Sequence, residues 1–140
     1  MTDVILETRN LKKSFGKLEV LKGISTGIRR GEVVSIIGPS GGGKSTFLRC
    51  MNLLEKPSSG QILFNGVDIC AKDQSKYIDQ HRQKMGMVFQ QFNLFNNMTV
   101  MKNLTAAPVR IKGMDKKQAE DKAIELLGRV GLADLSLIHI

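Results

Sequence analysis

Two short apolar runs open the chain, at residues 4–8 and 20–24, and turn-forming residues 14–17 lie between them. Apolar runs bounded by turn residues predict strands, and this spacing predicts an antiparallel hairpin with Phe15 at its bend. A lone aromatic residue at a bend is usually part of a core. It can also offer a stacking face to a nucleotide base.

Residues 33–37 form a compact run of Val-Val-Ser-Ile-Ile. Such a β-branched run predicts a strand buried on both faces, as in a parallel sheet. Further on, apolar residues recur at helical spacing from Phe47 to Leu54. This periodicity predicts a helix that starts near Lys44.

Two segments downstream also favour β-structure. Residues 61–69 carry Asn65 and Gly66 between two apolar runs, which predicts a hairpin with a tight primed turn. Residues 85–89 form a second compact apolar run, predicted to be a buried strand that ends at Gln90. The polar stretch at residues 77–84 is predicted to be a short helix or a loop.

The last third of the chain has the pattern of two helices. Thr99 is predicted to cap the first, and Pro108 is predicted to stop it. Asp115 is predicted to cap the second, and Gly131 to end it. The second helix is amphipathic, with an apolar face of Ala119, Ala123, Leu126, Leu127 and Val130.

The segment between the predicted strand 33–37 and its helix carries the candidate chemistry. It reads Gly38-Pro39-Ser40-Gly41-Gly42-Gly43-Lys44-Ser45-Thr46, which fits the phosphate-loop pattern G-x-x-x-x-G-K-[ST] at every fixed position. Glycines let the backbone N–H groups turn toward phosphate oxygens, and the helix N-terminus adds partial positive charge. Lys44 would reach the β- and γ-phosphates, and Ser45 would offer its hydroxyl to Mg²⁺. The sequence therefore predicts a nucleotide site.

Composition changes this picture little. The 140 residues are 41% hydrophobic, which suits one globular domain with its own core. The net charge of +8 comes from scattered basic residues, which suits an anionic nucleotide and predicts no nucleic-acid partner. No signal peptide is visible, and no apolar run is long enough to cross a bilayer. Cys50 and Cys70 are expected to be reduced cysteines of a cytosolic protein, and His81 and His139 indicate no metal site.

A carboxylate that completes such a site is missing from the pattern. Phosphate loops of this kind work with an acidic residue at the end of a second buried strand. Asp68 comes nearest, but the Asn65-Gly66 turn places it in a return strand. The run at residues 87–89 closes on Gln90, which is not a carboxylate. The sequence thus predicts a phosphate cradle without its catalytic acid.

Several collinear motifs, taken together, resemble one family. They are the phosphate loop, Leu-Arg-Cys-Met-Asn-Leu-Leu-Glu at 48–55, Gly-Gln-Ile at 60–62, Met-Val-Phe-Gln-Gln-Phe-Asn-Leu-Phe at 87–95 and Val-Gly-Leu-Ala-Asp at 130–134. With them, residues 4–134 resemble the N-terminal part of an ATP-binding-cassette (ABC) transporter ATPase. Within that family they are most similar to the ATP-binding subunit of polar amino-acid importers.

This resemblance implies a fold and a set of site residues. The fold would be α/β: a P-loop NTPase core of ABC type with an N-terminal antiparallel β subdomain and the start of the helical subdomain, the C-terminal part missing. Phe15 would stack on adenine. Gln90 would contact Mg²⁺ or the attacking water and sense the γ-phosphate. The triphosphate would be held by Ser40, Gly41, Gly42, Gly43, Lys44, Ser45 and Thr46, with Ser45 on Mg²⁺.

The resemblance also implies partners and a place of work. The protein would dimerise with a second ATP-binding subunit at the cytoplasmic face of the membrane. Membrane permease subunits would dock near the stretch from Phe92 to Met98. ATP and Mg²⁺ would be its cofactors.

The family pattern is incomplete in this sequence. The signature Leu-Ser-Gly-Gly-Gln stretch, the aspartate-bearing strand with its catalytic glutamate and the switch histidine do not occur in it. No catalytic residue is therefore predicted. The chain is expected to bind nucleotide at most and to hydrolyse essentially none, although the family is one of ATPases. With core strands lacking, a marginally stable chain with an exposed sheet edge is also expected.

The domain prediction divides the chain at residue 134. Residues 1–134 are expected to be the N-terminal part of a transporter nucleotide-binding domain. The tail Leu-Ser-Leu-Ile-His-Ile at 135–140 is similar to a translated sequencing-adapter end, and a natural apolar tail is the alternative. Two other readings of function stay open: a P-loop NTPase linked to nucleic acid, and a natural short protein that binds a transporter subunit without catalysis.

Overall fold

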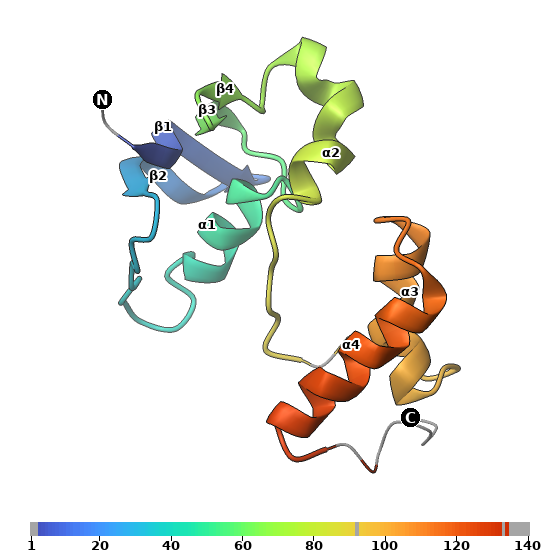
Figure 1. The fold of residues 1–140 in the computed structure, drawn as a ribbon. Coiled ribbons are helices and arrows are strands. Elements are labelled where there is room, and N and C mark those ends of the chain that lie inside the picture. The colour runs from blue at the N-terminus through green and yellow to red at the C-terminus, as the bar shows by residue number, and fades with distance from the viewer. Residues whose placement is uncertain (1–2, 92, 133, 135–140) are drawn as a thin grey trace. The chain divides into compact units, whose positions relative to one another are not determined.

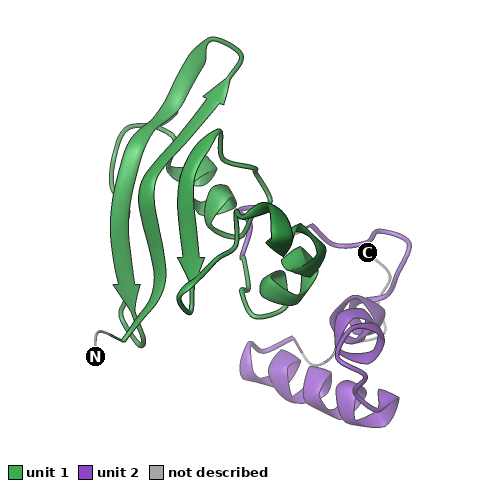
Figure 2. Cartoon of the chain, turned by 90° about the horizontal axis from the view of Figure 1, so that it is seen from above, with its two compact units in different colours: residues 1–87 green, residues 88–140 purple. Residues whose placement is uncertain are grey.

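The computed structural model describes residues 3–91, 93–132 and 134 (Figure 1). The chain divides into two compact units, residues 1–87 and 88–140, each of which is described by itself (Figure 2). The elements in chain order are β1 (Val4–Phe15), β2 (Leu18–Arg29), α1 (Lys44–Met51), β3 (Ser59–Phe64), β4 (Val67–Asp68), the 3-10 helix η1 (Lys72–Tyr77), α2 (Ile78–Arg82), α3 (Val100–Arg110) and α4 (Lys116–Arg129).

An antiparallel sheet organises the first unit. Its strand order is β2-β1-β3-β4, with β1 hydrogen-bonded to both β2 and β3. The β1–β2 ladder runs from the pair Val4 and Arg29 to the pair Phe15 and Leu18, with several register shifts. The predicted hairpin is confirmed, and it is longer than its apolar runs because the polar positions between them also pair.

The core of the first unit lies between this sheet and α1. Side chains from β1, β2, β3, α1 and the segment after β4 meet there and exclude water. Burial of each such large apolar side chain stabilises the fold by about 1.5–3 kcal/mol. The buried cluster consists of Leu11, Leu21, Phe47, Cys50, Met51, Ile62, Phe64 and Ile69.

Glycines shape the second hairpin and its join to β1. Asn65 and Gly66 have φ values of 49° and 79°, so the predicted primed turn between β3 and β4 is confirmed. Gly60 has a φ of 93°, and a Cβ atom at Gly60 would lie 2.4 Å from the carbonyl oxygen of Asn10. Only glycine therefore allows β3 to approach β1 at this point.

Two predicted strands are absent from the part of the chain that the structure describes. Residues 33–37 form no strand, and Val33 and Ile37 are each 93% exposed. Residues 85–89 also form no strand, and Val88 is 98% exposed. A strand requires a hydrogen-bonded neighbour, and no described strand pairs with either run. Both strand predictions are therefore wrong, because apolar composition could not show whether a pairing partner was present.

The second unit is a pair of packed helices, α3 and α4. Both predicted caps are confirmed: Thr99 Oγ1 accepts from Lys102 N at 3.2 Å, and Asp115 Oδ1 accepts from Lys117 N at 2.9 Å. Gly131, at φ 73°, follows the end of α4 as predicted.

Two predictions for these helices are wrong. Pro108 lies inside α3, which continues to Arg110. A proline removes one N–H and so weakens a single turn, and here that turn is the last of the helix. On α4, Ala119, Ala123 and Leu127 are buried, but Leu126 and Val130 are 42% and 66% exposed. The apolar face of α4 is wider than the stripe that α3 covers.

Candidate functional site

The glycine-rich loop at residues 38–46 curls tightly before α1. Gly41 and Gly43 have φ values of 77° and 85°, in the left-handed region that favours glycine. The N–H of Gly42 donates to the carbonyl of Pro39 at 3.2 Å, which closes a turn inside the loop. The N–H of Phe47 donates to the carbonyl of Gly43 at 2.8 Å, so the helix begins at Lys44 as predicted.

Lys44 folds back over this loop. Its Nζ donates to the carbonyl oxygens of Gly38 and Pro39 at 2.8 and 2.7 Å. The residue is half-buried, and these two bonds hold the ammonium group at the loop. An anion at the loop would be met by this charge, which carries three donors.

The beginning of α1 has the electrostatics of an anion site. Its capping residue Gly43 makes no side-chain bond to the helix, and the first turn contains no acidic residue. The first N–H groups of a helix have no intrahelical acceptor, and together they carry a partial positive charge. Ser40 and Ser45 are exposed, whereas Thr46 is half-buried. This arrangement can accept a phosphate-like group.

Gly43 also joins the loop to the β1–β2 hairpin. A Cβ atom at Gly43 would lie 2.9 Å from Val20 Cγ1 and 3.2 Å from Leu21 Cδ2. Only glycine lets the loop lie this close to β2. Leu21 is also the partner of Lys13 in the ladder, so the loop lies against the part of the hairpin that leads to Phe15.

Phe15 ends β1 and does not belong to the buried core. It pairs with Leu18, and its side chain is 47% exposed. The Nζ of Lys13 lies 4.6 Å from the centroid of its ring. The core-packing reading of Phe15 is therefore wrong, because the hairpin extends past the region that α1 covers. The other reading, a partly open aromatic surface, fits what the structure places here.

The other candidate polar residues lie elsewhere. Asp68 is in β4, the return strand, where it accepts hydrogen bonds from Gln61 Nε2 and Cys70 N, both at 3.0 Å. Gln90 is exposed and belongs to the second unit, so its place relative to the loop is not defined. Among the described residues, no group of three His, Cys, Asp or Glu side chains could hold a metal ion.

Sequence reasoning missed a contact at the far end of α1. Arg82 of α2 donates from Nε to the carbonyl of Asn52 at 3.2 Å and from Nη2 to the carbonyl of Leu53. These carbonyls follow the last turn of α1 and would otherwise lack helical partners. The positive charge of Arg82 also suits the negative end of the helix. No local sequence signal marks such a contact.

Both cysteines lie in or beside the buried core of the first unit. Burial raises the pKa of the Cys50 thiol above its usual value. Burial also raises the pKa of Cys70, to about 11, and the charge of Asp68 acts in the same direction. Both thiols are free, as predicted, and both are neutral at physiological pH.

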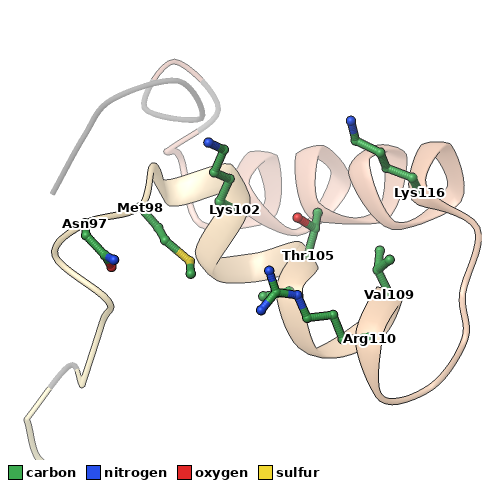
Figure 3. Close-up of a pocket in the computed structure, with 8 residues that line it drawn as sticks. Asn97, Met98, Lys102, Thr105, Val109, Arg110 and Lys116 are labelled. Carbon is green, nitrogen blue, oxygen red and sulfur yellow. The ribbon is translucent and has the colours of Figure 1, made fainter.

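The second unit contains a pocket of about 360 Å³ on one face of α3 (Figure 3). Two of its lining residues, Asn97 and Met98, belong to the stretch predicted to dock a membrane subunit, of which Phe92 lies outside the described residues. For the lining residues on α3, helical spacing was the available signal, whereas Lys116 is the first residue of α4. The remaining lining residues are Lys102, Thr105, Ala106, Val109, Arg110 and Lys116.

Comparison with known proteins gives close relatives. A family model described as ABC transporter matches residues 21–139. The arginine transport ATP-binding protein ArtM of Bacillus subtilis (strain 168) is 52% identical over 91% of this chain and 52% of its own length. The histidine/lysine/arginine/ornithine transport ATP-binding protein HisP of Escherichia coli (strain K12) is 45% identical over 94% of this chain and 55% of its own. The chain thus spans about half the length of the curated relatives it matches.

Solved structures agree with the sequence comparison. The dimeric structure of MJ0796, described as a bacterial ABC transporter cassette, matches with a TM-score of 0.85 and 31% identity. The match covers 96% of this chain and 61% of that chain. Within the described residues, no helix is long and apolar enough to cross a membrane.

Proposed function

This chain belongs to the ABC transporter family, and from that premise we propose that the protein containing it is the ATP-binding subunit of an importer of polar amino acids. The predicted α/β P-loop fold and the predicted likeness to amino-acid transport subunits are both confirmed by the relatives. The observation that carries the proposal is the glycine-capped loop with the Lys44 ammonium held over it. As a unit of the domain we propose residues 1–134, whereas the tail at 135–140 lies outside the described residues.

The loop would hold the triphosphate of ATP. In this assignment Lys44 exchanges its bonds to the carbonyls of Gly38 and Pro39 for bonds to phosphate oxygens. A hydrogen bond that involves a charged group contributes about 1.5–3 kcal/mol. Phosphate oxygens carry a negative charge that the carbonyl oxygens lack, so the exchange favours the nucleotide-bound state. The residues that would surround the phosphates are Ser40, Gly41, Gly42, Gly43, Lys44, Ser45 and Thr46.

Phe15 would receive the adenine base. Its ring is partly open, and the hairpin that carries it touches the loop through Val20 and Leu21. An aromatic stack contributes about 1 kcal/mol beyond the area that it buries. A base on Phe15 and phosphates at Lys44 would be the two ends of a single ligand.

Magnesium fits the groups that are present. Ser45 offers an exposed hydroxyl at the start of α1. The proposed role of Gln90 on the same ion rests on the family resemblance alone. Mg²⁺ prefers oxygen ligands and is held largely by nucleotide phosphates and water, so it needs no cage of carboxylates. Bound with ATP, the ion would neutralise charge on the β- and γ-phosphates.

We propose that this chain binds nucleotide without hydrolysing it. In the family, hydrolysis needs an acidic residue beside the attacking water. Among the described carboxylates Asp68 comes nearest to the expected sequence pattern, and its side chain is hydrogen-bonded to Gln61 and to the N–H of Cys70. Gln90 can orient water, but its amide cannot take a proton. The complete protein would act as an ATPase with a second copy of the ATP-binding subunit.

The proposed membrane partner would dock on the pocket of the second unit, with the protein at the cytoplasmic face of the membrane. Met98 lines the pocket together with the apolar side chains of Ala106 and Val109, and Lys102, Arg110 and Lys116 line it as well. Three cations beside apolar side chains suit a membrane-subunit segment that combines apolar side chains with a carboxylate. A permease subunit is therefore the occupant that we propose.

Titration calorimetry of the 140-residue chain with ATP and Mg²⁺ tests the nucleotide site. The expected result is binding that Lys44→Ala weakens by at least about tenfold, because a charged donor is lost. The exposed Lys112 in the second unit gives a matched control, since Lys112→Ala removes the same charge away from the loop and should leave binding unchanged. ATP binding that is equal in wild type and Lys44→Ala would contradict the proposal. A separate phosphate-release assay should show no turnover above the Lys44→Ala background.

A further inference from the structure

Lys13 is an unusually well-held lysine at the end of the hairpin. Its side chain is 12% exposed, and its Nζ lies 2.6 Å from Glu55 Oε1. The same Nζ donates to the carbonyl of Lys56 at 2.8 Å. Lysine side chains normally extend into water, so this degree of burial is worth explaining. Two fixed partners hold the ammonium group in one place.

That place is over the ring of Phe15. Lys13 and Phe15 are two residues apart in β1 and so lie on the same side of the strand. The ammonium lies 4.6 Å from the ring centroid, within the range of a cation–π contact. A cation held over one face leaves the opposite face as the one on which a flat ligand can stack. Phe15 is 47% exposed, so part of its surface is open to such a ligand.

We infer that Lys13 is a positioning residue for nucleotide recognition: it fixes the Phe15 ring so that the base stacks on the face away from the ammonium. The inference rests on the proposed nucleotide site and adds a residue to it. Lys13 acts through Phe15 and does not touch the base itself.

The partners of Lys13 connect the ring to the phosphate loop. Glu55 and Lys56 follow α1, the helix whose first residue is Lys44. Two further bonds hold the same connection: Ser14 N donates to Ser58 Oγ at 2.9 Å, and Ser58 N donates to the carbonyl of Lys12 at 2.8 Å. The spacing between the ring and the loop is thereby fixed through one helix. A ligand with a base at one end and phosphates at the other requires such fixed spacing.

A simpler role is that Lys13 only stabilises the fold through its pair with Glu55. The two roles make different predictions for ligands with and without a base. A structural role would alter binding of every anionic ligand alike, through the loop. A positioning role would alter only ligands that stack on Phe15. ATP and inorganic tripolyphosphate form the probe pair, since they share a triphosphate and differ in the nucleoside.

The experiment measures both dissociation constants for Lys13→Met by titration calorimetry in the presence of Mg²⁺. Lys13→Met should weaken ATP binding about three- to tenfold, the range expected for a partly desolvated cation–π contact, and leave tripolyphosphate within twofold of wild type. Lys13→Arg keeps a cation over the ring and should restore ATP binding. Lys12→Met, a neighbour of equal charge, should change neither ligand. The double variant Lys13→Met with Glu55→Gln removes both charges and replaces the single variant if that fails to fold.

Three results would overturn the inference. They are ATP binding by Lys13→Met equal to wild type, an equal loss of ATP and tripolyphosphate, and a Lys13→Arg variant as weak as Lys13→Met. Failure of the proposed function has a different signature, because the wild-type chain would then bind neither ligand. In that case the inference is also overturned.

Discussion

Two apolar stretches of similar character have opposite fates in this molecule. Ile62 in β3 is fully buried, between β1 and β4 in the sheet, whereas Ile37 in the run before the phosphate loop is 93% exposed. Both runs are apolar and contain β-branched isoleucine, and both lie beside glycines. What separates them is a hydrogen-bonded neighbour: β3 pairs with β1, and no described strand pairs with residues 33–37.

The comparison shows which parts support the candidate site. The loop at residues 38–46 leads into α1, and the unpaired run at residues 33–37 precedes it. Its geometry is fixed from the helix side, by α1, by the contact of Gly43 with Val20, and by the Lys44 bonds. The described loop has this geometry with no paired strand at residues 33–37.

The largest difference should come from truncating one isoleucine in each stretch. Ile62→Ala removes a fully buried side chain from the core and should lower the free energy of unfolding by about 4 kcal/mol. Ile37→Ala removes exposed atoms and should change it by no more than about 0.5 kcal/mol. Urea denaturation of both variants measures the difference. Similar losses in the two variants would mean that residues 33–37 are packed after all.

A pair of glycines sharpens the comparison within the sheet. Gly60→Ala places a Cβ 2.4 Å from a backbone oxygen of β1, so β3 must move, at a cost of about 3 kcal/mol. Gly66 also has a positive φ, but nothing lies within 4 Å of its added Cβ. Gly66→Ala should therefore cost only about 1 kcal/mol of backbone strain. Thermal melting checks the order, and a Gly66 variant that melts lower than the Gly60 variant would refute it.

Arg82 tests whether α1 is held at its far end. Arg82→Met leaves the carbonyls of Asn52 and Leu53 without their charged donor and should destabilise the first unit by about 2 kcal/mol. Arg49, in the last turn of α1, is the matched control, because Arg49→Met removes a charge near the same helix end and should cost about 0.5 kcal/mol. Faster labelling of the buried Cys50 thiol would report opening of the helix. Equal labelling in the two variants would rule out a specific role for Arg82.

The smallest expected effect concerns the burial of the Cys70 thiol, which follows the paired strands β3 and β4. Burial raises the pKa of Cys70 to about 11, so little thiolate forms at pH 8. The greater nucleophilicity of a high-pKa thiolate offsets part of this loss, and labelling should be about tenfold slower than for a free thiol. Since the unfolded thiol ionises at lower pH than the folded one, stability should fall as pH rises from about 9 to 11. Peptide mapping after timed alkylation measures the rate, and labelling as fast as in a free peptide would contradict the burial.

Local signals predicted more of this molecule than non-local ones. The turn at Asn65 and Gly66, the caps at Thr99 and Asp115 and the start of α1 at Lys44 depend on neighbours in sequence, and all are confirmed. The runs at 33–37 and 85–89 depend on strands elsewhere, so their composition could not decide their structure.

The candidate site divides in the same way. The phosphate loop is a contiguous motif and could be found in the sequence, but its roles remain predictions. The contacts of Lys13 with Glu55 and of Arg82 with Leu53 join residues far apart in the chain. No periodicity or spacing marks such pairs. Phe15 was assigned a stacking role by resemblance, whereas the ammonium over its ring is visible only in the structure.

Amide hydrogen exchange of the 140-residue chain tests the central comparison most directly. In the part of the chain that the structure describes, no N–H of residues 33–37 donates to a backbone carbonyl, whereas β1 is bonded on both sides. The amides of residues 33–37 should therefore exchange within about tenfold of unstructured rates, and those of the β1–β3 ladder should be protected by the free energy of unfolding of the unit. Equal protection of the two regions would show that the run before the phosphate loop is a paired strand, and the account would be wrong.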